Sequence, residues 1–461
     1  MPRAVIWFLC VAVVLALPLF AAPVYIGDQV KARFTENMNT QRDYLHKLNL
    51  ELRTASYQQE LYGARAKVLY ADRETGSTLC SAVHDIRHGP FLFSKSTFGL
   101  AAIDSRIEIP EHLKKNHLTM AGNASPLTAE SLMGFDGSVT SSIASPRLSW
   151  HSKQVSFSWD SLEGNLLAEQ NSKKLLFLDL SLPNLELKEP KSESRYLLEQ
   201  VGLNSSWKQD PEGESGNQTF SLTADRFTSQ TGSASGPSMR SLTVSSRGQW
   251  SQGMMNSSLE LRFAALKAGA LTLEQGVLQT SLENLNQSAM KRFLKLAQAS
   301  EKQEAKPSLA TISELQSLAV ELLRSSPSLE ISRLQFQTGN GTVSLQGRLG
   351  YQSGDKSVSL KDEKALLGRL KGQADLAVPE DFAVRIISVP LSFSALLEPD
   401  KHQGFGEKSL DTYAAERARA WLGILRSTGF IEKSGARYST RARLDNGRLA
   451  VNGIQVLDLN R

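Results

Sequence analysis

The stretch from Leu329 to Leu349, LEISRLQFQTGNGTVSLQGRL, shows most clearly the residue pattern from which the fold class is predicted. Apolar and polar residues alternate on both sides of the turn sequence Gly339-Asn340-Gly341. Such alternation is typical of half-buried β-strands, and a short Gly- and Asn-rich turn between two of them is typical of a hairpin. Between Ile331 and Leu334 the alternation slips by one position, as a β-bulge would cause. The stretch therefore predicts two antiparallel strands that each bury one face.

The same alternation dominates the chain from about Glu51 onward. Further strands are indicated by apolar residues at every second position: Val155, Phe157 and Trp159; Leu176, Leu178, Leu180 and Leu182; and Leu259, Leu261 and Phe263. Turn-forming sequences separate the strands: Asp136-Gly137, Gly232 to Pro237, and Asp445-Asn446-Gly447. We therefore expect a mainly β protein (α+β class) with long, curved antiparallel sheets and a few packed amphipathic helices.

The helices are predicted from apolar residues at helical spacing. One helix follows Gly27 and Asp28, with these residues on one face: Val30, Phe34, Met38, Leu45 and Leu48. Three later helices are marked by the following groups: Leu285, Ala289, Phe293 and Leu296; Ile312, Leu315, Leu318 and Leu322; Ala414, Ala418, Trp421 and Leu425. They place a helical insert around 283–325 and a helix-strand segment around 411–461.

The N-terminal segment from Ala4 to Ile26, AVIWFLCVAVVLALPLFAAPVYI, contains no charged residue. It is long enough to cross the ~30 Å hydrocarbon core of a bilayer as a helix. A cleaved signal peptide is the alternative, because Ala21 and Ala22 are small. Pro23 would follow the cut, however, and bulky residues stand three positions before either bond. We therefore predict an uncleaved transmembrane anchor over 1–27, a juxtamembrane helix over 28–50 and a β-rich body over 51–461.

The charge distribution excludes some partners but does not orient the anchor. The 461 residues include 52 Lys and Arg and 47 Asp and Glu, a net charge of +5, and the charges are interleaved. Without a basic stripe, nucleic-acid binding has no support, and none is expected. Lys31 and Arg33 beyond the anchor balance Arg3 before it, so the positive-inside rule alone does not place the body. Cys10 and Cys80 are not expected to pair.

The motifs that suggest catalysis or metal binding fail on spacing. His84 and His88 flank Asp85, but the surrounding run reads as a strand ending at a turn, where residues four apart lie about 13 Å from each other. A hydrogen-bonded structural role is expected for histidines at this position. Gly232 to Gly236 has Ala234 where a nucleophile would stand and is expected to be a loop. Gly404 to Ser409 misses the phosphate-loop spacing. We therefore expect no catalytic residue, no metal site and no cofactor.

Three segments, together with the N-terminal anchor, resemble the YdgA family of bacterial envelope proteins. They are residues 86–91 (IRHGPF) with 98–105 (FGLAAIDS), residues 326–331 (SPSLEI) leading into 338–341 (TGNG), and residues 446–453 (NGRLAVNG). The chain departs from the family pattern at Tyr62-Gly63, where an Arg-Gly pair is expected. The residues of interest in these motifs, structural or functional, are His88, Gly89, Pro90, Asn452 and Gly453.

The resemblance implies a single-pass anchor in the bacterial inner membrane with the bulk of the chain in the periplasm. The family is also remotely similar to AsmA-like proteins, which implies curved sheets and lipid movement between envelope membranes. Three functions follow in order of preference: lipid handling or envelope maintenance through an apolar sheet surface, an interaction scaffold for envelope proteins, and an enzyme acting on envelope polymers. Expected partners are the membrane, a phospholipid or other lipid, and an envelope protein. A dry sandwich core would give the same alternation as a lipid-binding sheet.

Overall fold

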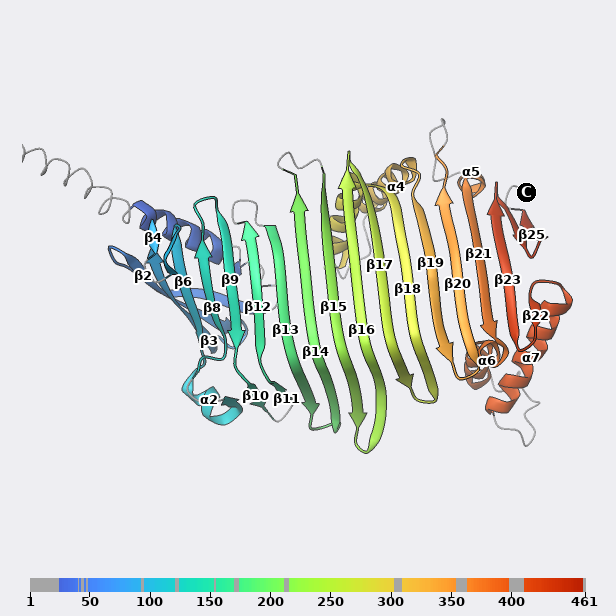
Figure 1. Ribbon diagram of the computed structural model, residues 1–461, viewed down its shortest axis with the longest axis horizontal. Helices are drawn as coiled ribbons and strands as arrows, with labels where there is room; N and C mark the ends of the chain where they lie inside the picture. The colour runs from blue at the N-terminus through green and yellow to red at the C-terminus, as the bar shows by residue number, and fades with distance from the viewer. Residues whose placement is uncertain are drawn as a thin grey trace, which may run out of the picture. The chain divides into compact units, whose positions relative to one another are not determined.

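The computed structural model describes residues 25–458 except 40, 43–44, 47–48, 93–94, 121–123, 153–154, 170–173, 211–214, 302–308, 354–362 and 398–409. The protein is mainly β, with one large antiparallel sheet and a few helices, as the alternation predicts (Figure 1). The chain divides into two compact units. The N-terminal unit holds Met1–Trp207 and Thr223–Gly236, and the C-terminal unit holds Lys208–Leu222 and Pro237–Arg461.

The N-terminal unit is a run of antiparallel strands with one long helix against it. Its strands pair in the order β1 (Leu50–Gln59), β2 (Gly63–Asp72), β3 (Thr78–His88), β6 (Ala101–Glu108), β8 (Thr128–Met133), β9 (Ser138–Ser145), β12 (Leu162–Glu169), β13 (Lys174–Glu189) and β14 (Ser194–Gln209). The short strands β7 (Leu118–Met120), β10 (Leu148–His151) and β11 (Ser156–Trp159) pair in turn beside the second half of β13. A short helix, α2 (Glu111–His117), precedes β7, and a two-stranded ribbon forms from β4 (Phe91–Leu92) and β5 (Thr97–Phe98).

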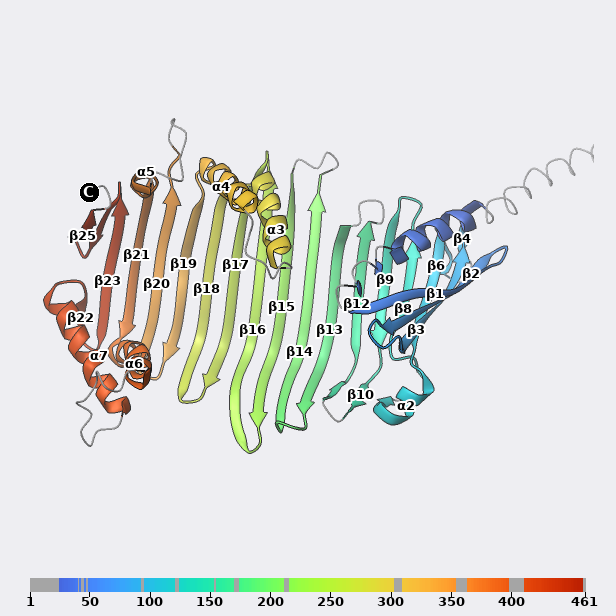
Figure 2. The same ribbon diagram turned by 180° about the vertical axis from the view of Figure 1, so that it is seen from behind.

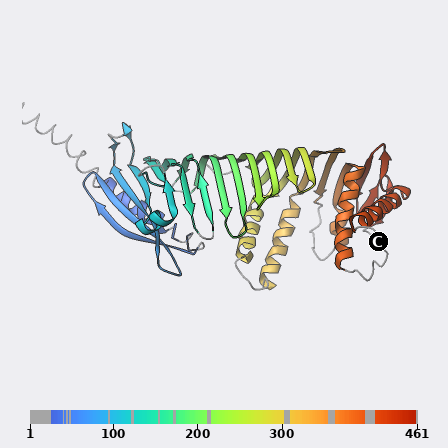
Figure 3. The same ribbon diagram turned by 90° about the horizontal axis from the view of Figure 1, so that it is seen from below.

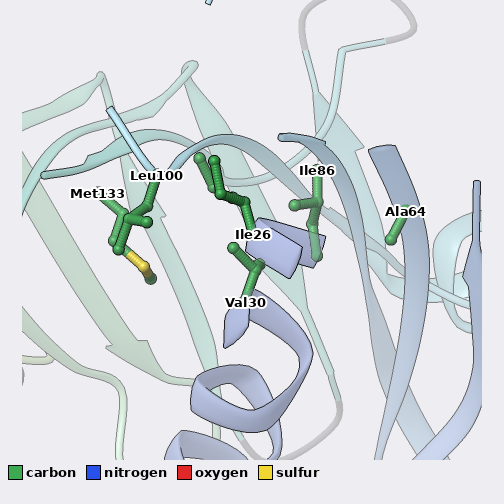
Figure 4. Packing of buried hydrophobic residues seen from close by; sticks show 7 residues of the cluster. Ile26, Val30, Ala64, Ile86, Leu100 and Met133 are labelled. Carbon is green, nitrogen blue, oxygen red and sulfur yellow. The ribbon is translucent and has the colours of Figure 1, made fainter. Parts of the chain in front are cut away.

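The N-terminal helix, residues 25–39, supplies the core of this unit. Its residues Ile26 and Val30 point toward Ile86, Leu100 and Met133 on the strands (Figure 4). About two turns further along, Met38 packs in a second buried cluster with Leu52 and Val68. The helix predicted after Gly27 is thus present, and the structure describes it from residue 25 onward.

The C-terminal unit is a second antiparallel run. Its strands pair in the order β16 (Ala234–Ser251), β17 (Met254–Ala268), β18 (Leu271–Asn286), β19 (Ser328–Thr338), β20 (Gly341–Tyr351), β21 (Leu370–Pro379), β23 (Arg437–Asp445), β24 (Arg448–Val451) and β25 (Ile454–Asp458). The short β22 (Glu432–Ser434) also pairs with β23, and β15 (Gly216–Thr231) has residues in both units. The helices are α3 (Gln287–Glu301), α4 (Leu309–Arg324), α5 (Glu363–Gly368), α6 (Glu380–Leu397) and α7 (Leu410–Ser427).

The hairpin predicted over Leu329 to Leu349 is confirmed. Strands β19 and β20 pair directly across the turn at Gly339 and Asn340, and their register shifts between Ile331 and Leu334. This is the position at which the alternation slips. The extra residue lets Leu334 and Ile331 stay on the same face despite their odd spacing.

Two local predictions need correction, and helix α6 was not predicted. The helical insert begins at Gln287 rather than near 283, because Leu285 is still paired within β18 and Asn286 caps the helix by accepting a hydrogen bond from the Ala289 amide at 3.0 Å. The segment from Gly232 to Pro237 is not a loop, because the strand resumes at Ala234 after a two-residue turn. Helix α6 escaped prediction because its β-branched residues and the internal Pro390 look unlike a helix.

The predicted membrane anchor lies almost entirely outside the described residues, since the structure describes the chain only from residue 25. Within the described part of the chain, no helix is both long enough and apolar enough to cross a membrane.

Removal of the Leu52 side chain should test the packing beneath the N-terminal helix. Leu52 is 1% exposed, so Leu52→Ala should lower the free energy of unfolding by about 2–5 kcal/mol. The matched control is Leu61→Ala, whose side chain is 45% exposed and which should change the stability by no more than about 0.5 kcal/mol. Urea unfolding of the full chain, followed by circular dichroism, measures both. Equal effects of the two substitutions would contradict this packing.

Candidate functional site

The sheet of the C-terminal unit has one apolar face and one polar face. Directly paired residues on neighbouring strands point to the same side of a sheet. Leu345 pairs with Leu334 on one side and with Leu376 on the other, while its neighbour Gln346 pairs with Asp375. The apolar face comprises Leu329, Ile331, Leu334, Leu345, Gly347, Leu349, Gly372, Ala374, Ala442, Leu444 and Leu449. The polar face comprises Gln335, Ser344, Gln346, Arg348, Gln373, Asp375, Arg441 and Arg443.

The apolar face contains a hollow of about 270 Å³. Two glycines on adjacent strands, Gly347 and Gly372, leave this part of the surface without side chains. Neither could be replaced freely, because a Cβ on Gly347 would lie 2.9 Å from the Gln373 carbonyl oxygen. Beside the hollow, Leu329 is 43% exposed and Leu349 is 44% exposed. This part of the face is therefore open, unlike the core of a sandwich.

Two helix pairs cover other parts of the apolar face. Figures 2 and 3 show α3 with α4, and α6 with α7, on the same side of the strands. The α6 residue Phe382 contacts Phe336, which pairs with Val343 and so belongs to the apolar side, with ring centroids 5.4 Å apart. Helices α6 and α7 also pack on β23 through a buried cluster, which comprises Ala383, Val384, Ala418, Leu422 and Tyr438. The hollow is the portion of the apolar face that these helices leave open.

The N-terminal unit has a pocket of its own, of about 510 Å³, beneath the edge of the N-terminal helix. Apolar side chains make up much of its wall: Phe34, Met38, Ile103, Met133, Val139, Leu166 and Leu175. Its polar lining includes a hydroxyl pair, Ser131 and Ser141, whose oxygens lie 2.7 Å apart. A mainly apolar pocket with a few polar groups is the usual form of a small-molecule site.

His84 and Ser105 also line this pocket and are the described residues that most resemble a nucleophile with its base. The Nδ1 atom of His84 lies 2.9 Å from the Ser105 hydroxyl oxygen. The other ring nitrogen, Nε2, is buried without a hydrogen-bond partner, so no carboxylate orients the imidazole. Burial lowers the pKa of His84, against the opposing charge of Asp85. The pair fits the expected structural, hydrogen-bonded histidine, and its partner Ser105 could not be identified from the sequence because strand pairing is needed to find it.

His88 ends β3 and lies against the start of the N-terminal helix. It is 5% exposed, and neither ring nitrogen has a hydrogen-bond partner. The expected hydrogen bond is therefore missing at this histidine. The imidazole packs directly on Gly27, where a Cβ would lie 2.8 Å from the ring carbon Cε1. Burial lowers the pKa of His88, and the nearby Asp28 carboxylate opposes that shift.

Gly89 and Pro90 lie directly after the end of β3. Gly89 does not adopt the left-handed backbone conformation that a sharp reversal would use. It is required instead by close approach, because a Cβ on Gly89 would overlap the Gly99 carbonyl oxygen. The Gly89-Pro90 peptide bond is cis, and the Pro90 carbonyl accepts a hydrogen bond from the Gly99 amide at 3.0 Å. The motif thus closes the strand end onto the segment that leads into β6.

Asn452 and Gly453 form the two-residue turn between β24 and β25. Both have positive φ, 48° and 82°, as a type I′ hairpin turn requires. The Asn452 side chain accepts a hydrogen bond from the Arg441 amide at 2.8 Å and donates one to the Gly429 carbonyl at 3.1 Å. It therefore joins the hairpin to β23 and to the residue that follows α7. This geometry gives Asn452 a structural role.

Among the residues that the structure describes, the remaining sequence motifs form no site. Gly232 is in a tight turn between β15 and β16, and residues 404–409 lie outside the described residues. Cys80 is a free thiol whose pKa is raised by burial, and Cys10 also lies outside the described part. The described residues contain no group of three His, Cys, Asp or Glu side chains arranged to hold a metal ion.

Replacement of His88 by leucine should test whether the buried imidazole lacks a hydrogen-bond partner, through its effect on how stability depends on pH. Below a pH of about 6.5 the unfolded chain binds a proton that buried His88 resists, so the stability falls with pH by up to about 1.4 kcal/mol per pH unit. His88→Leu should keep or raise the stability at pH 7.5 and reduce its loss between pH 6.5 and 5.5. Urea midpoints measure both, and exposed His112→Leu is the control. Strong destabilisation at pH 7.5 would show that His88 has a partner.

The comparisons with known proteins bear on the chain as a whole. A family model described as a bacterial protein of unknown function, DUF945, matches residues 4–457. No curated protein and no solved structure matches the chain. Because the family model covers nearly all of the sequence, including the apolar N-terminal segment and the β-rich body, the chain belongs to DUF945, a bacterial family of unknown function.

Proposed function

We propose that this chain is a non-enzymatic, membrane-anchored envelope protein that handles lipid through its apolar surfaces. In this proposal residues 1–27 anchor it in the bacterial inner membrane and the body lies in the periplasm. The segmental resemblance to the YdgA family and the remote similarity to AsmA-like proteins support this location and this substrate class. Their support is by analogy, because fold alone does not define function.

The observation that carries the proposal is the open part of the apolar face. The described strands that lie outside the large sheet are β4 and β5, so no second sheet stacks on it within the described chain. Leu329 and Leu349, which pair directly with each other, consequently stay exposed beside the Gly347 and Gly372 hollow. Each methylene group of an acyl chain that leaves water for such a surface contributes about 0.8 kcal/mol. An extended acyl chain therefore suits this open apolar surface better than a polar metabolite does.

The pocket of the N-terminal unit supports the same substrate class independently. Its volume of about 510 Å³ lies within the range of small-molecule sites, and its wall is mainly apolar. The hydroxyls of Ser105, Ser131 and Ser141 offer hydrogen bonds to an ester or a headgroup at one wall. The enzymatic alternative is weaker, because the His84 and Ser105 pair lacks an orienting acid.

An interaction scaffold is the second candidate, and α6 and α7 favour it. Ile386 and Val389 on α6 are 55% and 64% exposed, and Trp421 and Ile424 on α7 are 49% and 53% exposed. Each pair is three residues apart and so shares one helix face. Exposed apolar helix faces of this kind are suited to a partner protein.

A photoactivatable phospholipid should crosslink to the apolar face in the full chain. Wild type and Gln346→Glu should yield crosslinked peptides from β19 to β24, whereas Leu349→Glu should lose most of them, because a carboxylate repels acyl chains from the hollow. Leu349 and Gln346 lie on opposite faces of the same strand, which makes them a matched pair. Peptide mass spectrometry identifies the crosslinks, and circular dichroism verifies that each variant keeps its sheet. Crosslinks confined to residues 4–26 would refute lipid binding by the body.

A photoreactive amino acid at position 421 tests the scaffold. If α7 docks a partner, crosslinking in cells should give a discrete protein adduct at Trp421 and none at Arg419, which is exposed on the same helix. Gel shift and mass spectrometry of the adduct measure this. The same weak pattern at both positions would remove the support for a scaffold.

A further inference from the structure

Several loops of the N-terminal unit lie together at one end of its strands. They are the β1–β2 turn (residues 60–62), the described residues between β3 and β6 (89–92 and 95–100), which contain the β4–β5 ribbon, and the β8–β9 turn (residues 134–137). Backbone hydrogen bonds join them: the His88 amide to the Tyr62 carbonyl at 2.9 Å, and the Leu100 amide to the Met133 carbonyl at 2.8 Å. The antiparallel strand order puts these connections at one end and the β2–β3 turn at the other.

The N-terminal helix begins at this same end. Ile26, in its first turn, packs with Leu100 and Met133 (Figure 4). Gly27 lies against His88, and the Gln59 side chain donates a hydrogen bond to the Asp28 carboxylate at 3.3 Å. The chain therefore enters the described structure at the loops, rather than at the opposite end of the strands.

Large apolar side chains are exposed around this entry point. Phe98 is 70% exposed, Tyr25 67%, Phe135 54%, Tyr62 53% and Leu61 45%. We call these four aromatic residues and the leucine together the aromatic rim. Phe91 supports Phe98 from behind, with ring centroids 5.1 Å apart, so the ribbon presents the Phe98 ring outward. Clustered exposure of this kind marks a surface that contacts something less polar than water.

The sequence before Tyr25 identifies what that surface contacts. Residues 4–26 contain no charge and are long enough to span a bilayer. The rim surrounds the last residues of that segment, where a spanning helix would leave the hydrocarbon. Tyrosine and other aromatic side chains are favoured at this level of a membrane, because a ring can bury its apolar body there while a hydroxyl stays hydrated.

The charges of the three loops indicate insertion rather than electrostatic attraction. Their ionisable residues are Glu60, Lys95 and Asp136, a net charge of −1. Lys95 is already paired with Glu130, and the Asp136 carboxylate accepts a hydrogen bond from the Ser138 hydroxyl at 2.7 Å. A surface that bound anionic headgroups by charge would instead carry several free Lys or Arg residues.

The geometry points to the aromatic rim as a membrane-seating surface, which inserts into the headgroup region of the bilayer beside the anchor and holds the N-terminal unit against it. This inference rests on the anchoring in the proposed function. It assigns to Phe98 and Phe135 a direct contact with phospholipid that an anchored body on a free tether would not make.

Depth-dependent fluorescence of the full chain tests the rim. With Cys10 and Cys80 replaced by alanine, single cysteines introduced as Phe98→Cys, Phe135→Cys and Glu74→Cys are labelled with a polarity-sensitive fluorophore. The chain is reconstituted in vesicles of phosphatidylethanolamine and phosphatidylglycerol, with or without nitroxide-labelled lipid. Glu74 is the matched control, because it is exposed in the β2–β3 turn at the opposite end of the strands.

Labels at 98 and 135 should be blue-shifted and should lose fluorescence with nitroxide lipid, whereas the label at 74 should not change. High salt should leave this loss intact, because screening weakens charge attraction but not insertion. If the chain floats with the vesicles but nitroxide lipid quenches all three labels weakly and to the same extent, the rim is overturned while the anchor stands. A blue shift at 98 without nitroxide quenching would overturn it in favour of a protein contact. A chain that fails to float with the vesicles would overturn the anchor and the rim together.

Discussion

The strict alternation of apolar and polar residues along unusually long strands is the constraint on which the rest of this structure depends. Each strand pair extends one apolar face, and in the C-terminal unit that face runs across β19, β20, β21, β23 and β24. A sandwich would bury such a face against a second sheet. Here helices cover parts of it, so the sequence must supply amphipathic segments at intervals, and α3, α4 and α7 each bury an apolar residue almost completely: Ala289, Leu318 and Ala418.

The same alternation explains how much of the fold the sequence could predict. Strand identity is local, so the hairpin over Leu329 to Leu349 and even its bulge between Ile331 and Leu334 are visible in one stretch of residues. Strand register is not local. Gly347 and Gly372 are unremarkable in sequence, and only the pairing of Leu349 with Gly372 brings them together as a hollow. Helix α6 was hidden for another reason: burial of Ala383 and Val384 against α7 stabilises a segment whose β-branched residues and Pro390 oppose helix formation.

The His88-Gly89-Pro90 motif shows why a recognisable sequence need not mark chemistry. Each member is explained by how closely its neighbours approach: Gly27 makes room for the imidazole, and Gly89 makes room for the Gly99 carbonyl. The geometry fixes the start of the N-terminal helix over the end of β3. An unpartnered buried imidazole disfavours protonation, and the adjacent Asp28 only partly offsets this. The two histidines that could have been metal ligands therefore have different roles. His84 shares a hydrogen bond with Ser105, and His88 is packed without a hydrogen-bond partner.

Exposed leucines beside a glycine-lined hollow are costly for a protein in water, because they promote association and contribute nothing to the core. A side chain larger than glycine at Gly347 or Gly372 would press on the backbone of the neighbouring strand, and the chain keeps these two glycines beside Ala374 and Ala442 in the unfilled part of the face. The opposite face of the same strands carries Arg348, Gln373 and Arg441, which keep that face polar. Under the proposed function, a surface that is polar on one side and unfilled on the other suits a ligand that is itself long and apolar, and no catalytic group is needed to hold it.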